Sequence, residues 1–470
     1  MKLWIEWFRC IHLLRNSCSR DRTFCWMALV ISALAIRPDG LGVTSFVRAA
    51  FLDPVCYYSL LNFFHSKALP LNKLLNVWVK LALKLFSPVT IDGYVVFAAD
   101  GLKVPREGKK MPAVKCLHQE SGNNSKAEYI MGHSFQAISL LALAASGQVF
   151  AVPLVSRICE GLIWRYQKNP ATLLDKLAGL FSEVTQIANV PAVLVADAYY
   201  ASKKIIEPLL DESHHLITRA KTNSVAYTPA AKPGKTKRGR PKLYGEKVKL
   251  RNLFKAGSAF FTKAISPVYG ETNVTIQYRV VDLLWRPVGR LVRFVLVKHP
   301  TRGMIILMCT NLDFDALTII KIYGLRFKIE VSFKQAVHTL GTYAYHFWMK
   351  PMKKIKRFSG NQYLVPKPKE YRQAVQRKLD AYHRYVQLGC IAQGLLQHLA
   401  INFRAEVWAT FKSWLRTMRP DMVPTEMVVA KALQASFPGF LLDKNFEPDM
   451  KKFILDRAQC DRVSGFSMTG

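Results

Sequence analysis

The sequence predicts an α/β fold whose sheet has strands of mixed direction, with helical regions on both sides of it along the chain. Three observations lead to this prediction. Short apolar runs rich in β-branched and aromatic residues recur between residues 94 and 221. Segments with helical spacing separate the later runs from one another. Two of the runs end directly in an aspartate, Asp100 and Asp197. Strands that alternate with helices are typical of the α/β class.

The first 88 residues predict helices. Apolar residues recur at helical spacing over residues 26–36, 57–64 and 71–85, with a break at Pro38. Two interpretations are open for this region. It is either a small helical DNA-binding domain or a helical cap on the main domain.

Residues 89–223 predict the first part of the core. The order is three strands, a helix, a strand, a helix and a strand. The segment from Gly101 to about Lys126 is polar and rich in turn formers, so we predict a loop there. The predicted strands are 94–99, 134–145, 148–155, 191–196 and 216–221, and the predicted helices are 171–187 and 203–210.

Residues 224–314 predict a basic loop followed by a β-rich insertion, with strands at 274–284, 290–298 and 304–309. Residues 315–345 return to the core as a helix that carries Glu330. Residues 346–470 are basic and mainly helical. The chain is longer than one hydrophobic core usually serves, which agrees with several domains.

The two strand-end aspartates and the helix form a candidate site. Ligands of open α/β sheets bind at the carboxyl ends of strands, where Asp100 and Asp197 lie. At about 100° per residue, Tyr323, Arg326, Glu330 and Lys334 share one face of a helix. The alternative is structural: aspartates often cap turns, and Arg326 with Glu330 is a common surface pair.

Carboxylate oxygens select hard cations, so Asp100, Asp197 and Glu330 predict a site for Mg²⁺ or Mn²⁺. Two such ions can activate the attacking oxygen and stabilise the leaving oxygen of a phosphodiester. Arg326 and Lys334 are suited to binding phosphate oxygens.

Charge and cysteine usage narrow the partners. The chain has 67 Lys and Arg against 32 Asp and Glu, a formal charge of +35, which favours nucleic acid or an anionic membrane. Membrane is the weaker alternative, because the apolar run over residues 24–36 is too short to cross a bilayer. The nine cysteines form no Cys-x-x-Cys pair, so we expect reduced thiols and an intracellular compartment.

These residues resemble a known family. The sequence looks like bacterial insertion-sequence transposases of the DDE type, and more narrowly like the group with a Tyr-x2-Arg-x3-Glu-x6-Lys signature. Tyr323, Arg326 and Glu330 match that spacing. Asp100 lies in Phe-Ala-Ala-Asp-Gly, and Asp197 in Val-Ala-Asp-Ala-Tyr-Tyr, with Tyr200 at the family's aromatic position. The resemblance covers about residues 88 to 345.

The resemblance implies an RNase H-like core and metal-dependent cleavage of the element's ends, followed by strand transfer into target DNA. It also implies Asp100, Asp197 and Glu330 as metal ligands, a homodimer on double-stranded DNA, and a cytoplasmic, nucleoid-associated protein without membrane attachment. One position departs from the signature, because Val337 stands where the lysine is expected. Either Lys334 takes over its phosphate contact, or this copy is impaired.

A second resemblance concerns DNA contacts. The run Arg238-Gly-Arg-Pro-Lys242 is similar to an AT-hook, whose arginines enter the narrow minor groove of A·T-rich DNA. We therefore expect Arg238, Arg240 and Lys242 to bind DNA; the alternative is a solvated basic loop. We also expect Tyr200 and Arg219 to contact DNA.

Two other functions compete with transposition. A catalytically impaired, transposase-derived protein would bind DNA without cutting it. A stand-alone RNase H-like nuclease would cut DNA without joining it. A membrane-surface protein is a more distant alternative, which liposome flotation would test.

Overall fold

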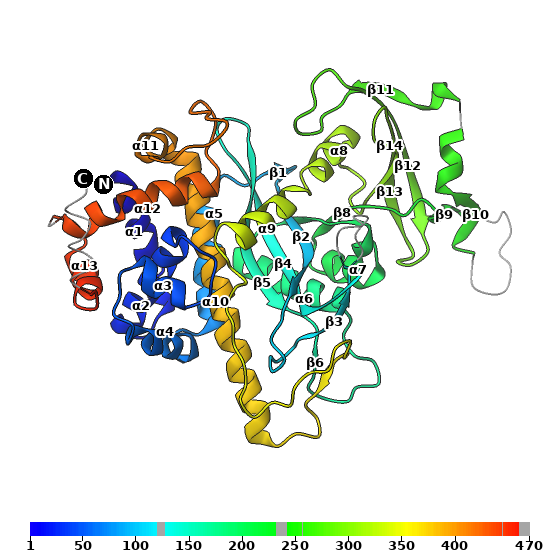
Figure 1. Ribbon diagram of the computed structural model, residues 1–470. Coiled ribbons are helices and arrows are strands. Elements are labelled where there is room, and N and C mark those ends of the chain that lie inside the picture. The colour runs from blue at the N-terminus through cyan, green and yellow to red at the C-terminus, as the bar shows by residue number, and fades with distance from the viewer. Residues whose placement is uncertain (120–126, 232–241, 256, 444, 460–470) are drawn as a thin grey trace. The chain divides into compact units, whose positions relative to one another are not determined.

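The structure is a computed structural model that describes residues 1–119, 127–231, 242–255, 257–443 and 445–459 (Figure 1). The chain forms two compact units. Unit 1 comprises Met1–Ser87, Gly101–Pro170 and Glu330–Gly470, and unit 2 comprises Pro88–Asp100 and Ala171–Ile329. The α/β class is confirmed: the structure has a large sheet with both parallel and antiparallel strand pairs, and many helices.

Three neighbouring parallel strands form the part of the unit 2 sheet that matters for the site. They are the first half of β2 (Tyr94–Pro105), β7 (Ala192–Val195) and β8 (His215–Arg219), in the order β2–β7–β8. All four residues of β7 are buried. A continuous apolar run of this kind is typical of a parallel strand that is covered on both faces.

Antiparallel strands continue the unit 2 sheet beyond β8. The order is β8, β14 (Gly303–Cys309), β13 (Arg290–His299), β12 (Thr275–Trp285), β9 (Val225–Pro229) and β10 (Tyr244–Lys249). Two short strands lie off this path: β1 (Thr90–Ile91) pairs with β2, and β11 (Thr262–Ile265) pairs with β12. The strands expected at 274–284, 290–298 and 304–309 correspond to β12, β13 and β14 of this sheet.

The helices of unit 2 begin and end at recognisable sequence signals. Helix α6 (Leu173–Ala188) begins at a capping box of Thr172 and Asp175, and ends at Asn189 in the left-handed conformation. It packs on α7 (Lys203–Asp211). Helix α8 (Ala316–Gly324) begins at Asp315, which accepts a hydrogen bond from the Thr318 amide, and packs on β8, β13 and β14.

The sequence predicted one continuous helix through Tyr323 and Lys334, and this prediction is wrong in detail. Helix α8 ends at Gly324, and α9 (Lys328–His338) begins after a short turn. Within the turn, the amides of Leu325 and Arg326 donate to carbonyls three residues back, at 3.0 and 3.1 Å, which is the tighter 3₁₀ pattern. Glycine permits the close approach here, since a Cβ at Gly324 would lie 3.2 Å from Val268 Cγ1.

Unit 1 is built around the 34-residue helix α10 (Lys369–Asn402). Helix α10 packs against helices from both ends of the chain and against β5 (Figure 1). The other helices are α1 (Lys2–His12), α2 (Asp21–Ile36), α3 (Thr44–Ala49), α4 (Cys56–His65), α5 (Leu71–Leu85), α11 (Arg404–Thr410), α12 (Glu426–Leu442) and α13 (Pro448–Leu455). Buried Arg384 ties α10 to the N-terminal helices by donating to the carbonyls of Leu69 and Phe64 at 2.8 and 3.0 Å.

In unit 1, pairing between strands gives an extended backbone to a polar segment that was predicted as a loop. The segment after Asp100 was predicted as a loop, but β2 continues to Pro105, and β3 (Lys115–His118) pairs antiparallel with β4 (Tyr129–Leu143). Hydrogen bonds to a neighbouring strand stabilise an extended backbone even where the local propensity is low. Strand β4 also pairs with β5 (Val149–Ile158), and β6 (Leu162–Ile163) pairs with β15 (Gln362–Tyr363).

None of the helices in the described ranges has the length and apolarity needed to cross a bilayer. The eight cysteines within those ranges are free thiols, seven of them in unit 1 and Cys309 in unit 2.

Candidate active site

Two aspartates lie at matching positions of unit 2: Asp100 is inside β2, and Asp197 follows the end of β7 by two residues. Strands β2 and β7 pair in parallel with Ala98 opposite Val195. Asp100 and Asp197 each follow their paired residue by two positions, so they share one level of the sheet. Adjacent strands are about 5 Å apart, and side chains two positions apart point to the same face. The register therefore places the two aspartates at the same level of neighbouring chain segments, two residues past the last parallel pair of β2 and β7.

Strand β8 adds a cation to the same row. Strands β7 and β8 pair with Val195 opposite Ile217, so Arg219 corresponds to Asp197 by the same offset of two. The Thr218 hydroxyl donates to the carbonyl oxygen of Asp197 at 2.6 Å, which keeps the chain after β7 close to β8. The sequence alone could not reveal this row, because strand register depends on tertiary pairing.

Asp197 also has a structural role, as the cap of a short helix. Its Oδ1 accepts a hydrogen bond from the Tyr199 amide at 2.8 Å and caps a short 3₁₀ helix, Ala198–Tyr200. The cap fixes the side chain at the strand end, so the structural role positions the carboxylate that the site would use.

Arg326 pairs with Asp100 inside unit 2. Its Nη1 lies 3.3 Å from Asp100 Oδ2, and both side chains are largely buried. The 3₁₀ turn after α8 therefore directs the guanidinium to the level of the two aspartates. A positive charge here offsets part of the repulsion between the neighbouring carboxylates.

Tyr323 lies in the same electrostatic environment. Burial raises the pKa of its phenol; the positive charges of Arg326 and Arg219 oppose this shift, and Asp197 adds to it. The phenol therefore stays protonated near neutral pH, and its hydroxyl can donate a hydrogen bond. The charges of Arg326, Arg219 and Asp197 thus all influence the pKa of the Tyr323 phenol.

A hollow of about 350 Å³ adjoins this neighbourhood, and sequence reasoning missed it. One wall is formed by α8 and the turn after it, with Ile320, Tyr323, Gly324, Arg326 and Phe327, and the β-rich insertion forms the rest. Four polar residues of the insertion meet beside it: Glu271 accepts from Ser266 at 2.5 Å and pairs with His299 at 3.0 Å and with Arg302 at 2.7 Å. The sequence signal for the hollow is weak, because its walls are far apart along the chain.

The remaining predicted residues differ in burial and in the unit that holds them. Glu330 and Lys334 are exposed residues of α9 within unit 1, and Val337 is partly exposed on the same helix. Tyr200 is only 3% exposed, whereas the neighbouring Tyr199 is 52% exposed. Lys242 is exposed just before β10, and Arg238 and Arg240 lie outside the described residues.

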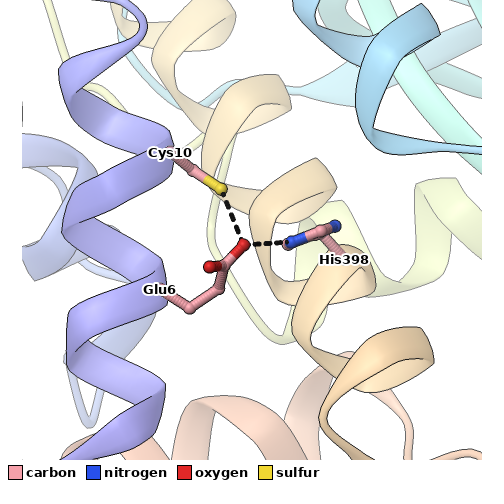
Figure 2. Close-up of side chains that lie close together, drawn as sticks. All are labelled: Glu6, Cys10 and His398. Carbon is pink, nitrogen blue, oxygen red and sulfur yellow. Dashed lines mark hydrogen bonds and ion pairs between the residues drawn. The ribbon is translucent and has the colours of Figure 1, made fainter.

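A second cluster of potential ligands lies in unit 1 (Figure 2). Glu6 and Cys10 on α1 and His398 on α10 bring one ligand atom each within 4.8 Å of the others. The Nε2 of His398 lies 2.7 Å from Glu6 Oε1, and the Cys10 thiol donates to the same oxygen at 3.4 Å. The Nδ2 of Asn402, an N–H donor, lies 3.1 Å from His398 Nδ1, so Nε2 carries the proton and donates to Glu6.

This cluster is a satisfied hydrogen-bond network rather than a metal centre. Arg9 already binds both oxygens of Glu6, at 2.7 and 2.6 Å. Burial alone would raise the pKa of Glu6, but hydrogen bonds from Arg9 and His398 outweigh it and lower the pKa to about 2. Burial, with the charge of Glu6, raises the pKa of Cys10 to about 12, so its sulfur stays a protonated thiol and a poor metal ligand.

Comparison with protein families identifies the class to which part of the chain is similar. Residues 168–341 match the family described as "Transposase DDE domain". The matched range includes Asp197, Arg219, Tyr323, Arg326 and Glu330, and begins after Asp100. Comparison with curated proteins finds no match to the chain.

Proposed function

We propose that the protein is the DNA transposase of an insertion sequence, which cleaves the element's ends and joins them to target DNA. The observation that carries this proposal is the parallel register that sets Asp100 beside Asp197. The similarity of residues 168–341 to a transposase DDE domain supports the same chemistry. The excess of Lys and Arg suits a polyanionic substrate.

The residues fit a divalent metal. Asp100 and Asp197 offer oxygen ligands only, and two neighbouring carboxylates are stabilised by a cation. We infer that both, with Glu330 from α9, hold Mg²⁺ or Mn²⁺, and that two ions bind. When bound, the ions would supply an activated oxygen nucleophile and stabilise the leaving oxygen.

The cations and the phenol near the aspartates would bind the scissile phosphate. A guanidinium offers paired N–H donors that match phosphate oxygens, so Arg326 and Arg219 are the candidates in unit 2. Tyr323 would donate its hydroxyl proton in a hydrogen bond without losing it, because burial raises its pKa. Arg326 would exchange part of its contact with Asp100 for phosphate when cation and DNA bind.

Residues of α9 complete the proposal. Glu330 follows Arg326 by four residues along the chain, and we propose it as the third carboxylate of the metal site. Lys334 follows Glu330 by one helical turn within α9 and would bind a phosphate in place of the signature lysine, which is Val337 here. We therefore propose membership of the Tyr-x2-Arg-x3-Glu-x6-Lys group, with Val337 as the one departure from its signature.

The order of elements suits an RNase H-like core. Along the chain, β2, β4 and β5 are followed by α6, β7, α7 and β8, which is the order predicted for that fold. We further propose a homodimer on paired DNA ends, with Arg238, Arg240 and Lys242 in the minor groove. Exposed Tyr199 is better placed than buried Tyr200 to touch DNA beside the site.

The proposal is tested with purified full-length protein and DNA that carries the element's ends. We expect Mg²⁺-dependent cleavage and joined products with a target plasmid, both lost in EDTA. Cleavage without joining would instead indicate a nuclease, and binding without cleavage an impaired, transposase-derived protein. Asp211→Asn, an exposed aspartate at the end of α7, is the matched control and should keep full activity.

A further inference from the structure

A basic segment joins α9 to α10 in unit 1 and is not used by the proposed chemistry. Residues 346–369 contain seven Lys and Arg and no acidic residue. The cations are Lys350, Lys353, Lys354, Lys356, Arg357, Lys367 and Lys369. The nearby Glu160 carboxylate is already paired with Lys115 at 3.2 Å. The segment therefore concentrates positive charge on one part of unit 1.

The backbone of this segment is anchored to the rest of unit 1. The amides of Met349 and Ile355 donate to the carbonyls of Lys110 and Lys109 at 2.9 and 2.7 Å, and the Cys116 amide donates to the Ser359 carbonyl at 2.7 Å. A small apolar core lies beneath, formed by Ala113, Met349, Met352, Leu364, Val375 and Leu379. The surface is held in one shape, which lowers the entropy lost when a ligand binds.

Large aromatic rings stand exposed among these cations. Trp348 is 76% exposed, and Tyr363 is 54% exposed. Tyr166, 71% exposed, lies with its ring centroid 6.4 Å from that of Tyr363. The short pairing of β6 with β15 holds the backbone of Tyr363 in place. Rings of this size are normally buried, so a group of them at the surface indicates a binding site.

The rings and cations line two adjoining hollows. One, of about 580 Å³, is lined by Lys109, Lys110, Trp348, Lys350 and Lys354, together with Gly108 and Met349. The other, of about 530 Å³, is lined by Tyr363, Tyr371, Lys353, Lys354, Lys356 and Lys367, among others. Lys354 belongs to both, so the two form one continuous surface, which we term the aromatic–lysine surface.

We propose that the aromatic–lysine surface binds single-stranded DNA, with bases stacked on Trp348 and Tyr363 and phosphates paired with the surrounding lysines. Unpaired bases expose π-faces that stack on aromatic rings, and a positively charged groove follows the backbone. Duplex DNA keeps its bases stacked and would use the lysines alone. A membrane surface fits less well, since the rings line hollows rather than the apolar face of a helix.

The proposal is tested by the affinity of the full-length protein for a fluorescent oligothymidine in EDTA, where cleavage does not occur. Trp348→Ala and Tyr363→Ala should each weaken binding about tenfold, the scale of one lost stacking contact. Trp348→Phe should restore most of the affinity. Trp414→Ala, which removes a ring that is 78% exposed elsewhere in unit 1, should leave affinity unchanged.

Charge is tested separately from stacking. Lys350→Ala with Lys354→Ala should reduce the salt dependence for the single strand by about 1.4 units, at about 0.7 per phosphate contact. Equal oligothymidine affinity for the parent and both ring variants, with intact thermal unfolding, would overturn the proposal. Loss of binding to phosphatidylserine vesicles in the ring variants, with DNA binding unchanged, would assign the surface to lipid. The test does not depend on Asp100 or Asp197, so it can fail while the proposed cleavage stands.

Discussion

Two groups of potential metal ligands in this molecule differ in composition and in what they can do. Glu6 in unit 1 is one carboxylate surrounded by donors, with Arg9, His398 and Cys10 all directed at it. Asp100 and Asp197 in unit 2 are two carboxylates at one level of a sheet. In the first arrangement, hydrogen-bond donors stabilise the charge of one carboxylate. In the second, two like charges share one level of the sheet, and their repulsion lowers folding stability.

This difference in surrounding charge indicates which acids are candidates for metal binding. Among the described residues, Glu6, Cys10 and His398 are the group whose ligand atoms all lie within 4.8 Å of one another. The donors around Glu6 stabilise its negative charge without an ion. Around Asp100 and Asp197, the structure supplies cations suited to phosphate, Arg326 and Arg219, at the open edge of the sheet. The arrangement of charge is thus more informative than distance alone.

The largest expected effect separates the two clusters by activity. Asp100→Asn or Asp197→Asn should lower the DNA cleavage rate by about 10³-fold or more, because each removes a charged ligand from the proposed metal site. DNA affinity in EDTA should change little. Near-normal cleavage by either variant would remove that aspartate from the site.

Replacing the acid of unit 1 should affect stability instead. Glu6→Gln leaves Arg9 and His398 without their anion and should lower the free energy of unfolding by up to about 3 kcal/mol. Cleavage per folded molecule should not change. Urea unfolding at pH 7 measures the loss, and Glu406→Gln, at an outer ion pair with Lys2 at 3.6 Å, serves as the control with little effect.

The stability difference between the parent and Glu6→Gln should depend on pH in a defined direction. The pKa of Glu6 is lowered in the folded protein to about 2, below its ordinary value of 4.5. Its contribution is therefore fully present above pH 4.5 and is lost as the pH falls toward 2. The stability difference between the parent and Glu6→Gln should shrink over that interval. A difference that stays constant with pH would contradict the charged state of Glu6.

A smaller effect concerns the substituted lysine. If Lys334 provides the phosphate contact, Lys334→Ala should lower single-turnover cleavage by about 10²-fold, and Val337→Lys should help little. The opposite pattern, a silent Lys334→Ala and a faster Val337→Lys, would mean that the site is impaired by Val337. Either result decides which residue of α9 serves the phosphate.

The smallest expected effect concerns the basic run that contains Arg238 and Arg240. Arg238→Ala with Arg240→Ala should weaken duplex DNA binding and reduce its salt dependence by about two units, because each lost contact releases one counterion fewer. Titration at several salt concentrations measures the slope. An unchanged slope would indicate a solvated loop.

The sequence predicted much of this architecture because its strands are compact and strongly apolar. The runs that became β7 and β8 were found within one or two residues, and so were β12, β13 and β14 of the insertion, whereas β9, β10 and β11 were not predicted. The 3₁₀ turn after Gly324 escaped prediction, because helical spacing alone does not register a change from four-residue to three-residue hydrogen bonds. Strand β3 escaped because its partner β4 stabilises a polar segment.

For the candidate site, the acidic residues could be predicted from the sequence, but the register of the strands that carry them could not. Which strands are neighbours, and that Arg219 shares the row of Asp197, depends on pairing between segments far apart in the chain. The Glu6–His398 contact joins residues 392 positions apart and has no local signal. Local chemistry was therefore predictable, whereas the partners of each group were not.

We propose that Asp100 and Asp197, and not the Glu6 cluster, hold a divalent cation. Mn²⁺ binding to the full-length protein, followed by electron paramagnetic resonance, tests it directly and without cleavage. We expect Asp197→Asn to lower the Mn²⁺ affinity at least tenfold, and Glu6→Gln to leave it unchanged. Unchanged binding in Asp197→Asn, or loss of binding in a folded Glu6→Gln, would contradict the assignment.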